Sequence, residues 1–194
     1  MIRVPNGLAG AGKTTAGEKV AEKYGWPFQS VGAWFREIAI ERGVEPQELE
    51  IQAQFDPTVD QILDGKTLEL ARRSPELVIE GRRVAYILQQ AFERGELREP
   101  PLKILLRCDD AVRFQRMADD PKRKEPRVEV VARQTLEREA AASVRYQVQY
   151  GMTLAELMDP ARYDFIINTT HLQERAMIQA VEACVKSRFL LQKV

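Results

Sequence analysis

The segment Gly7–Thr14, with the sequence GLAGAGKT, constrains this chain more than any other feature. It fits the pattern G-x-x-x-x-G-K-[ST] at every fixed position. A short β-rich run over Met1–Val4 precedes it and is expected to break into a loop at the following Pro-Asn-Gly. The helical spacing of Lys13–Tyr24 follows it and stops at Gly25. A chance glycine-rich turn is the alternative, but the strand–loop–helix context favours a phosphate-binding loop.

Each residue type in this loop has a chemical reason to be there. Glycine lets backbone N–H groups wrap a phosphate at close range, in conformations that a side chain would block. The N-terminus of the following helix adds partial positive charge. We expect Lys13 to face solvent in the empty loop and to reach the β- and γ-phosphates of ATP, and the Thr14 hydroxyl to coordinate Mg²⁺. The residues expected to bind ATP here are Gly7, Gly10, Ala11, Gly12, Lys13, Thr14 and Thr15.

The balance of charge narrows the range of partners. The chain has 194 residues, with 29 Lys and Arg against 29 Asp and Glu, and so a formal net charge of zero. A general binder of nucleic acid or of anionic membranes would depend on net positive charge, so neither partner is expected. No apolar run approaches the roughly 18–20 residues that span a bilayer, and the N-terminus does not fit a signal peptide. We therefore expect a cytoplasmic protein.

The cysteines and the histidine point away from metal-cluster or triad chemistry. Cys108 and Cys184 show no paired spacing, and both lie in apolar or helical patterns typical of small buried residues. His171 is the only histidine and is expected to border the last helix.

Short apolar runs alternate with helical patterns along the chain. The alternation predicts an α/β protein with the P-loop kinase fold, a roughly five-stranded parallel sheet with helices on both faces, in a single domain over 1–194. Beyond the first strand and helix, strands are predicted at Phe28–Val31, Leu77–Ile79, Leu102–Leu106 and Phe165–Ile167. Helices are predicted at Ala33–Arg42, Pro46–Gln54, Pro57–Arg73, Val84–Glu93, Asp109–Ala118, Val128–Tyr150 and from Leu172 onward, with an exposed charged loop over 119–127.

Two arginines follow predicted strands at the edge where ligands bind. Arg36 lies one turn into the second helix, and Arg82 comes soon after the strand Leu77–Ile79. In open α/β sheets, ligands bind outside the carboxyl ends of the strands, so both residues are candidates to clamp an acceptor phosphate. The alternatives are that Arg36 pairs with Glu37 in solvent and that Arg82 is a turn residue.

The longest predicted helix, Val128–Tyr150, carries Arg138 and Arg145. Seven residues make two turns, so both arginines lie on one face, roughly 10 Å apart. Ala141 and Ala142, and no acids, lie between them on that face, which suits the binding of an anion. An ordinary solvated face is the alternative. A second face of this helix aligns the residues Leu136, Ala140, Val144 and Val148.

At this point the chain resembles a family. Several of its segments occur in the order and spacing of cytidylate kinases, and the resemblance is closest to the short archaeal type and covers nearly the whole chain. Beside the phosphate-binding loop, these segments are VGAWFRE (31–37), FDPTVDQ (55–61), LVIEGR (77–82), TLERE…RY…YG (135–151) and YDFIINT (163–169).

The resemblance implies an acceptor-binding region at about 31–73 and a lid at about 117–140. Matched motif by motif, the expected roles fall into four groups. Arg36 and Arg82, beside Val31 and Gly32, would bind the acceptor and its phosphate. Arg138 and Arg145, with Lys13, would be catalytic at the transferring phosphoryl group. The residues beside the ATP base would be Arg116, Asn168 and Thr169, and Glu80 would hold Mg²⁺ through a water.

The chain departs from the family pattern at a few positions. Val31 stands where bacterial relatives have serine, and Ala33 where archaeal relatives have an acid, both in the stretch expected near the base. Asp120 replaces a frequent lid arginine, for which nearby Arg123 is a candidate substitute, and Ala142 replaces an acid between the two helix arginines.

The combined interpretation is an enzyme that transfers the γ-phosphoryl group of ATP to a pyrimidine nucleoside monophosphate, CMP or dCMP and possibly UMP. The expected partners are ATP, this acceptor and Mg²⁺, with the protein acting as a monomer. Two alternatives stay open: a P-loop kinase for another small acceptor, and a non-catalytic nucleotide-binding regulatory module. Against the second stand the arginines at acceptor and lid positions and the lack of an Asn/Thr-Lys-x-Asp element for reading guanine.

Overall fold

A computed structural model describes residues 1–121 and 127–191, apart from the side chains of the last four. Its centre is a five-stranded sheet, with all neighbouring strands parallel. The order is β2-β3-β1-β4-β5. Strand β1 is therefore the central strand, and the loop that follows it begins at the middle of the sheet's carboxyl edge. The predicted fold class is confirmed. The strands are β1 (Ile2–Gly7), β2 (Phe28–Ser30), β3 (Leu77–Glu80), β4 (Leu102–Arg107) and β5 (Phe165–Asn168).

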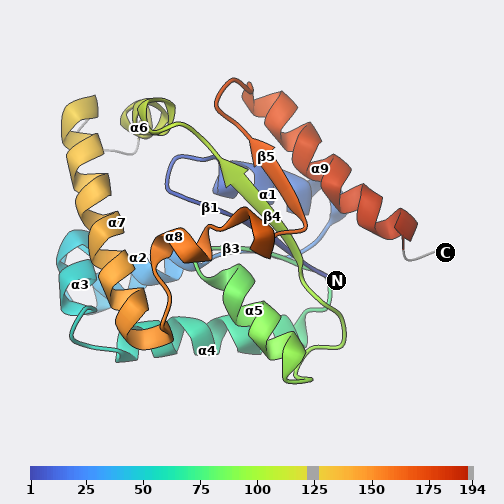
Figure 1. Ribbon diagram of the computed structural model, residues 1–194, viewed down its shortest axis with the longest axis horizontal. Coiled ribbons are helices and arrows are strands. Elements are labelled where there is room, and N and C mark those ends of the chain that lie inside the picture. The colour runs from blue at the N-terminus through green and yellow to red at the C-terminus, as the bar shows by residue number, and fades with distance from the viewer. Residues whose placement is uncertain (122–126, 192–194) are drawn as a thin grey trace.

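Helices cover both faces of this sheet. Helices α1 and α9 pack together on one face, and α4 and α5 on the other (Figure 1). Helix α7 stands at the left edge of the view, beside α3, on the side toward which the strands' carboxyl ends point. The helices are α1 (Lys13–Tyr24), α2 (Val31–Glu41), α3 (Pro46–Gln52), α4 (Thr58–Arg73), α5 (Val84–Glu93), α6 (Asp110–Ala118), α7 (Val128–Tyr150), α8 (Leu154–Leu157) and α9 (Glu174–Leu191), with a 3₁₀ turn at Pro160–Arg162.

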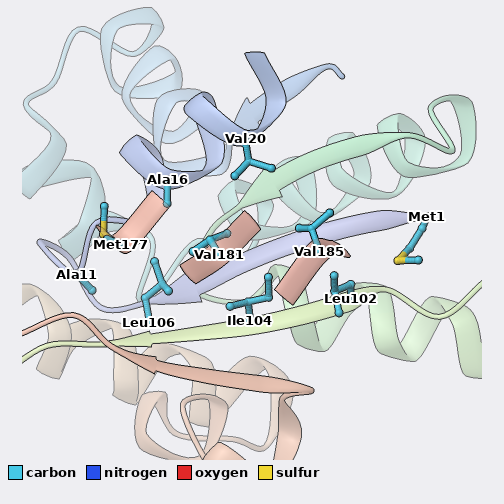
Figure 2. Close-up of a cluster of buried hydrophobic side chains, with 10 residues drawn as sticks. All are labelled: Met1, Ala11, Ala16, Val20, Leu102, Ile104, Leu106, Met177, Val181 and Val185. Atoms are coloured by element: carbon cyan, nitrogen blue, oxygen red, sulfur yellow. The ribbon is translucent and has the colours of Figure 1, made fainter. Parts of the chain in front are cut away.

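The core is divided by the sheet into two main clusters. On one face, Ala16 and Val20 of α1 meet Val181 and Val185 of α9 above the aliphatic side chains of β4 (Figure 2). On the other face, β3 and the first residues of β1 pack against α4 and α5 through residues such as Ile79 and Leu88. Because both faces are covered, the first three residues of β3 and the central residues of β4 are continuous apolar runs rather than alternating ones.

Local signals predicted most of the element boundaries. Helices α1, α5 and α7 begin and end at the residues predicted. Gly25 and Gly151 end α1 and α7 in the left-handed conformation, at φ of 67° and 68°, which glycine adopts at little cost.

Several other ends shift by one or two residues, and α2 begins at Val31, which was predicted to end the preceding strand. Larger differences occur at β1 and after α7. Strand β1 does not break at Pro5 but continues to Gly7, because Pro5 pairs with Ile104 along an unbroken register with β4. Helix α8 and the 3₁₀ turn were not predicted, since elements of three or four residues show no periodicity. A capping box at Thr153 and Glu156 was the signal for α8.

Helix α7 packs through a different face than its aliphatic pattern suggests. Leu136, Val144 and Val148 are exposed, at 48%, 59% and 76%. The buried positions include the polar residues Thr135, Glu139 and Arg145. This helix therefore packs through ion pairs as well as through apolar contacts such as those of Ala142 and Tyr146. Within the described part of the chain, no helix is both long and apolar enough to cross a membrane.

Candidate active site

A large cleft of about 1190 Å³ opens at the carboxyl edge of the sheet. Its walls come from the loop after β1, from α2, α3 and α4, from the turn after β3, and from α6, α7 and α9. Most of the residues expected to bind substrates share this one cleft, although they are spread over the chain. These are Gly10, Gly12, Lys13, Thr14, Thr15, Val31, Gly32, Arg36, Glu80, Arg82, Arg116, Arg138 and Arg145.

The loop between β1 and α1 requires glycine for two separate reasons. Gly7, Gly10 and Gly12 have φ of 147°, 80° and 95°, values that other residues rarely adopt. A Cβ on Gly7 would lie 2.4 Å from the Leu106 carbonyl oxygen, and one on Gly10 would lie 2.5 Å from the backbone of α6. Gly7 and Ala11 are buried and do not line the cleft, so they shape the loop without facing the space inside it.

Lys13 is folded over this loop. Its ammonium donates a hydrogen bond to the Leu8 carbonyl at 2.9 Å, and the side chain is half-buried, so the expectation that it faces solvent was wrong. Burial lowers the pKa of Lys13, an effect that the Glu80 carboxylate opposes and the Arg82 guanidinium reinforces. A cation held over a ring of backbone N–H groups is suited to phosphate oxygens.

Three oxygen-bearing side chains meet where β3 ends. The Thr14 hydroxyl donates to Glu80 Oε1 at 3.1 Å, and the Ser30 hydroxyl donates to the same oxygen. Glu80 is 4% exposed. Such hard oxygen donors suit Mg²⁺, which also keeps waters and phosphate oxygens as ligands. Among the described residues no group of three or more His, Cys, Asp or Glu is placed to form a metal site, so phosphate and water would have to complete the shell.

Ser30 was not among the expected site residues. It is the N-cap of α2, where its hydroxyl accepts from the Ala33 N–H at 3.3 Å while it donates to Glu80. A serine directly before a helical pattern was the available signal. Its second role depends on the pairing of β2 with β3, which places Ser30 opposite Glu80.

The three residues expected beside the nucleotide base do not all line the cleft. Arg116 lines the cleft and donates to the carbonyls of Thr169 and Leu172 at 2.7 and 3.2 Å. Thr169 is fully buried, and its hydroxyl donates to the Ala11 carbonyl at 3.1 Å, so it supports the loop from beneath. Asn168 is exposed and is not part of the cleft lining. The cleft therefore gathers Arg116 but neither of these two residues.

Arg113 is a further residue of the site that the sequence did not reveal. It is 1% exposed, pairs bidentately with Glu139 of α7 at 2.9 and 2.8 Å, and donates to the Ala9 carbonyl in the phosphate loop at 3.4 Å. Asp110 binds its Nε at 2.7 Å. In sequence, Arg113 belongs to a polar helix pattern, and only the packing of α6 against α7 brings Glu139 to it. It ties the phosphate loop to α7.

On the acceptor side, Arg36 and Arg82 lie in the same cleft, as expected. Arg36 is exposed, with its guanidinium beside Gly32, where a Cβ would lie 3.6 Å from Nη1. Arg82 is half-buried, and its carbonyl accepts from the Asn6 side chain at 3.3 Å. Val31 packs tightly against Gly81, where a Cβ would lie 2.9 Å from the valine Cβ.

The two arginines of α7 differ in their surroundings. Arg138 is half-buried in the cleft, 3.5 Å from the Thr135 hydroxyl. Arg145 is 3% exposed and forms ion pairs with Glu50 of α3 at 3.1 Å and Asp60 of α4 at 3.0 Å. The prediction that carboxylates would be absent around these arginines therefore fails for Arg145, because α3 and α4 supply its acidic partners. Arg123, the candidate lid arginine, lies outside the described residues.

Comparison with known proteins identifies relatives over nearly the whole length. A family model described as an AAA domain matches residues 6–137. The cytidylate kinase of Pyrococcus horikoshii is 33% identical over 185 residues, which covers 95% of this chain and 88% of the relative. The cytidylate kinase of Natronomonas pharaonis is 31% identical over 187 residues, covering 96% and 90%.

Solved structures support the fold alone. A shikimate kinase from Bacteroides thetaiotaomicron superposes with a TM-score of 0.61 at 16% identity, covering 99% of this chain and 98% of that one. A gluconokinase from Sinorhizobium meliloti gives 0.60 at 16% identity, covering 99% and 97%. At such low identity, these likenesses carry no information on the acceptor.

Proposed function

The chain belongs to the cytidylate kinases, with residues 6–137 in the AAA domain family, and from this premise we propose that it transfers the γ-phosphoryl group of ATP to CMP, giving CDP and ADP. The observation that carries the proposal is the convergence of Lys13, Arg36, Arg82, Arg138 and Arg145 on one cleft. A phosphate-rich pair of substrates requires such a set of cations, and a passive nucleotide-binding module does not. Family membership likewise favours an enzyme over that module.

The reaction demands little covalent chemistry from the protein. The attacking group is a phosphate oxygen of the acceptor, already ionised at neutral pH, so no general base is needed. Catalysis comes from in-line positioning and from cations around the charge that spreads over the equatorial oxygens. A site without a histidine suits this reaction.

The site divides into a donor side and an acceptor side. We assign the phosphates of ATP to the backbone N–H groups of the loop over 7–14 and to Lys13, with Arg116 beside the base. Arg36 and Arg82 are assigned to the acceptor phosphate, with Gly32 and Val31 beside the acceptor. Arg138 and Arg145, which α7 contributes to the cleft lining, are assigned to the transferring group.

Magnesium fits the donor set at the end of β3. Thr14 would coordinate Mg²⁺ directly, and Glu80, with Ser30 beside it, would hold a coordinated water. Bound there, the ion would neutralise charge on the β- and γ-phosphates. Turnover should therefore be lost with EDTA and return with added Mg²⁺.

A coupled assay of ADP release across a panel of acceptors tests the proposal. We expect turnover that depends on CMP or dCMP. UMP should follow within about two orders of magnitude, because the apolar Val31 and Ala33 leave no polar group unpaired when the base changes. A strong preference for AMP, GMP or a non-nucleotide acceptor would favour another small-acceptor kinase. ATP hydrolysis that no acceptor stimulates would favour the regulatory module.

Several further expectations belong to the same proposal. We propose one domain over 1–194, with an acceptor-binding region at about 31–73 and a lid at about 117–140, part of which lies outside the described residues. A cytoplasmic monomer is the form we expect, with small molecules and neither nucleic acid nor membrane as partners.

A further inference from the structure

A ladder of alternating charges runs along one wall of the cleft. Its order is Glu50, Arg145, Asp60, Arg83 and Asp64, which joins α3, α7, α4 and the turn after β3. Asp60 stands in the centre, with Oδ2 at 3.0 Å from Arg145 Nε and Oδ1 at 2.9 Å from Arg83 Nη2. Asp60 and both arginines are at most 5% exposed.

Asp60 differs from the other two acids of the ladder. Among the described residues, Glu50 pairs only with Arg145, at 3.1 Å, and Asp64 pairs only with Arg83, at 2.8 Å. Asp64 also accepts a hydrogen bond from Tyr150 at 2.8 Å. Within the described part of the chain, Asp60 is the carboxylate that pairs with both arginines. A change at Asp60 thus reaches two guanidinium groups on two different elements.

The ladder keeps these arginines charged and oriented. Burial acts to lower the pKa of Arg145, but Tyr146, Glu50 and Asp60 outweigh it and the pKa is raised. The same holds for Arg83, where Tyr146, Asp60 and Asp64 oppose burial. A buried cation without its carboxylate would be strongly unfavourable, so the acids decide where each guanidinium lies.

Two nitrogen atoms of the Arg145 guanidinium, Nε and Nη1, form no hydrogen bond with the described residues. Both are buried, although the side chain lines the cleft. The contact with Asp60 is an ion pair whose geometry does not qualify as a hydrogen bond. The acids therefore hold the guanidinium at the cleft wall without using all of its donors.

Arg83 connects the ladder to the acceptor side. It directly follows Arg82, whose side chain lines the same cleft, and its guanidinium is held by Asp60, Asp64 and Tyr150. Because Arg83 is fixed on one side of the turn, the backbone that presents Arg82 is fixed as well.

We propose that Asp60 is a positioning residue for phosphoryl transfer. It holds Arg145 at the wall where the transferring group passes and, through Arg83, steadies the turn that presents Arg82 to the acceptor phosphate. This inference rests on the proposed function, since it takes the phosphate roles of Arg82 and Arg145 from it.

Two matched variants on α4 test the proposal. Asp60→Asn keeps the size of the side chain and removes the charge shared by both arginines, so we expect kcat to fall on the order of 10²-fold and KM for the acceptor to rise. Asp64→Asn, one turn along the same helix, leaves the Asp60–Arg145 pair intact. It should raise KM for the acceptor while keeping kcat at least about tenfold above that of Asp60→Asn. KM for ATP should stay within about threefold in both. Equal kcat values in the two variants would overturn the proposal.

A third variant and a second readout guard against loss of folding. Where Asp60→Asn does not fold, Asp60→Glu keeps the charge but displaces it by one methylene; positioning predicts a fall in kcat of about tenfold or more, and unchanged kcat contradicts it. The ¹H–¹⁵N signal of Arg145 Nε reports the contact without turnover. It should shift in Asp60→Asn and stay in place in Asp64→Asn, and no shift in Asp60→Asn would also overturn the proposal. A wild-type protein without CMP-dependent turnover would refute the proposed function instead, whatever this signal does.

Discussion

At the scale of single residues, surroundings decide what each cation can do. Lys13 and Lys19 lie two turns apart on α1 and carry the same group. Lys19 is about half exposed and pairs with Glu22 at 2.8 Å on the surface, an arrangement worth little. Lys13 is folded over the phosphate loop with a lowered pKa, because burial disfavours its charge. Its cationic form, which already donates to the Leu8 carbonyl, would gain an anionic partner when phosphate binds.

We predict that Lys13→Ala folds normally and loses phosphoryl transfer. The side chain makes one hydrogen bond, to the Leu8 carbonyl, so removing it should change stability little. Steady-state turnover and thermal melting of the variant provide the measurement, with Lys19→Ala as the control on the same helix. Turnover near that of the wild type in Lys13→Ala would contradict the role of the loop.

A second residue-scale prediction concerns Arg36 and Arg82. Replacing either by alanine removes a charge-assisted contact to the acceptor phosphate, worth about 1.5–3 kcal/mol. The KM for CMP should rise by about 10- to 150-fold while the KM for ATP is kept. Arg42→Ala serves as the control. Arg42 comes directly after α2, the helix that carries Arg36, but it pairs with Asp56 at 2.9 Å and does not line the cleft. An equal rise in both KM values would show that the roles are not divided in this way.

At the scale of elements, α7 shows what a helical pattern can and cannot predict. Its ends at Val128 and Tyr150 follow from periodicity and from the glycine at 151, and both were predicted correctly. The inward face was not predictable, because Leu136, Val144 and Val148 form the more apolar stripe and yet lie in solvent. Partners from α3, α4 and α6 select the buried face, and no local pattern contains them.

Because local patterns do not contain distant partners, the sequence could predict the phosphate loop and its glycines but not the contacts of Arg113 and Ser30. The loop motif is local, and each glycine answers a backbone requirement within it. Arg113 acquires its role from Glu139, 26 residues away, and Ser30 from Glu80, 50 residues away.

We predict that Arg138→Ala lowers kcat far more than it weakens the binding of either substrate. Arg138 lines the cleft, and in the role that we propose for it at the transferring group it would meet charge that appears mainly in the transition state. A cation of this kind is worth roughly 10³–10⁵ in turnover. Arg138→Lys, which keeps the charge but loses the planar fork, should recover only part of the loss.

The control for Arg138 is Arg133→Ala, an exposed arginine of the same helix that does not line the cleft. Arg145→Ala is a poorer kinetic probe, since it would leave Glu50 buried without its cation, and Asp60 with Arg83 but not Arg145, and so destabilise the protein as well. Unchanged kcat in Arg138→Ala would make α7 a scaffold only.

A stability prediction also belongs to α7. Glu139→Ala removes the bidentate partner of the fully buried Arg113 and leaves the exposed Asp110 to offset its charge, which should lower the free energy of unfolding by up to about 3–5 kcal/mol. Urea denaturation measures the change. Glu137→Ala, exposed on the same helix, should cost under about 0.5 kcal/mol. Equal effects in the two variants would mean that the Arg113–Glu139 pair does not hold α7 to the phosphate loop.

At the scale of the whole molecule, the fold follows from a few general rules. Alternating apolar strands and helices predict a covered parallel sheet, and the loop motif after the first strand places the phosphates at its carboxyl edge. The position of α7 beside α3, and with it the far wall of the cleft, depends on long-range ion pairs such as Arg145–Glu50. The cleft is therefore a property of the assembled molecule, lined by segments from both halves of the chain.

This arrangement predicts how substrates stabilise the protein. A ligand bound across the cleft contacts α1, α2, the turn after β3 and α7 together, and unfolding must release it. At one hundred times the dissociation constant, such a ligand adds about 2.7 kcal/mol to the free energy of unfolding. For a chain of this size, the melting temperature should then rise by about 5–10 °C. We expect this rise with CMP alone, and about twice this rise with CMP, Mg²⁺ and a non-hydrolysable ATP analogue together, when each ligand is at one hundred times its dissociation constant. Lys13→Ala should lose the part due to the ATP analogue and keep the part due to CMP, whereas Arg82→Ala should do the reverse. A CMP-dependent rise that Lys13→Ala abolishes and Arg82→Ala leaves intact would show that the two sides of the cleft are assigned the wrong way round.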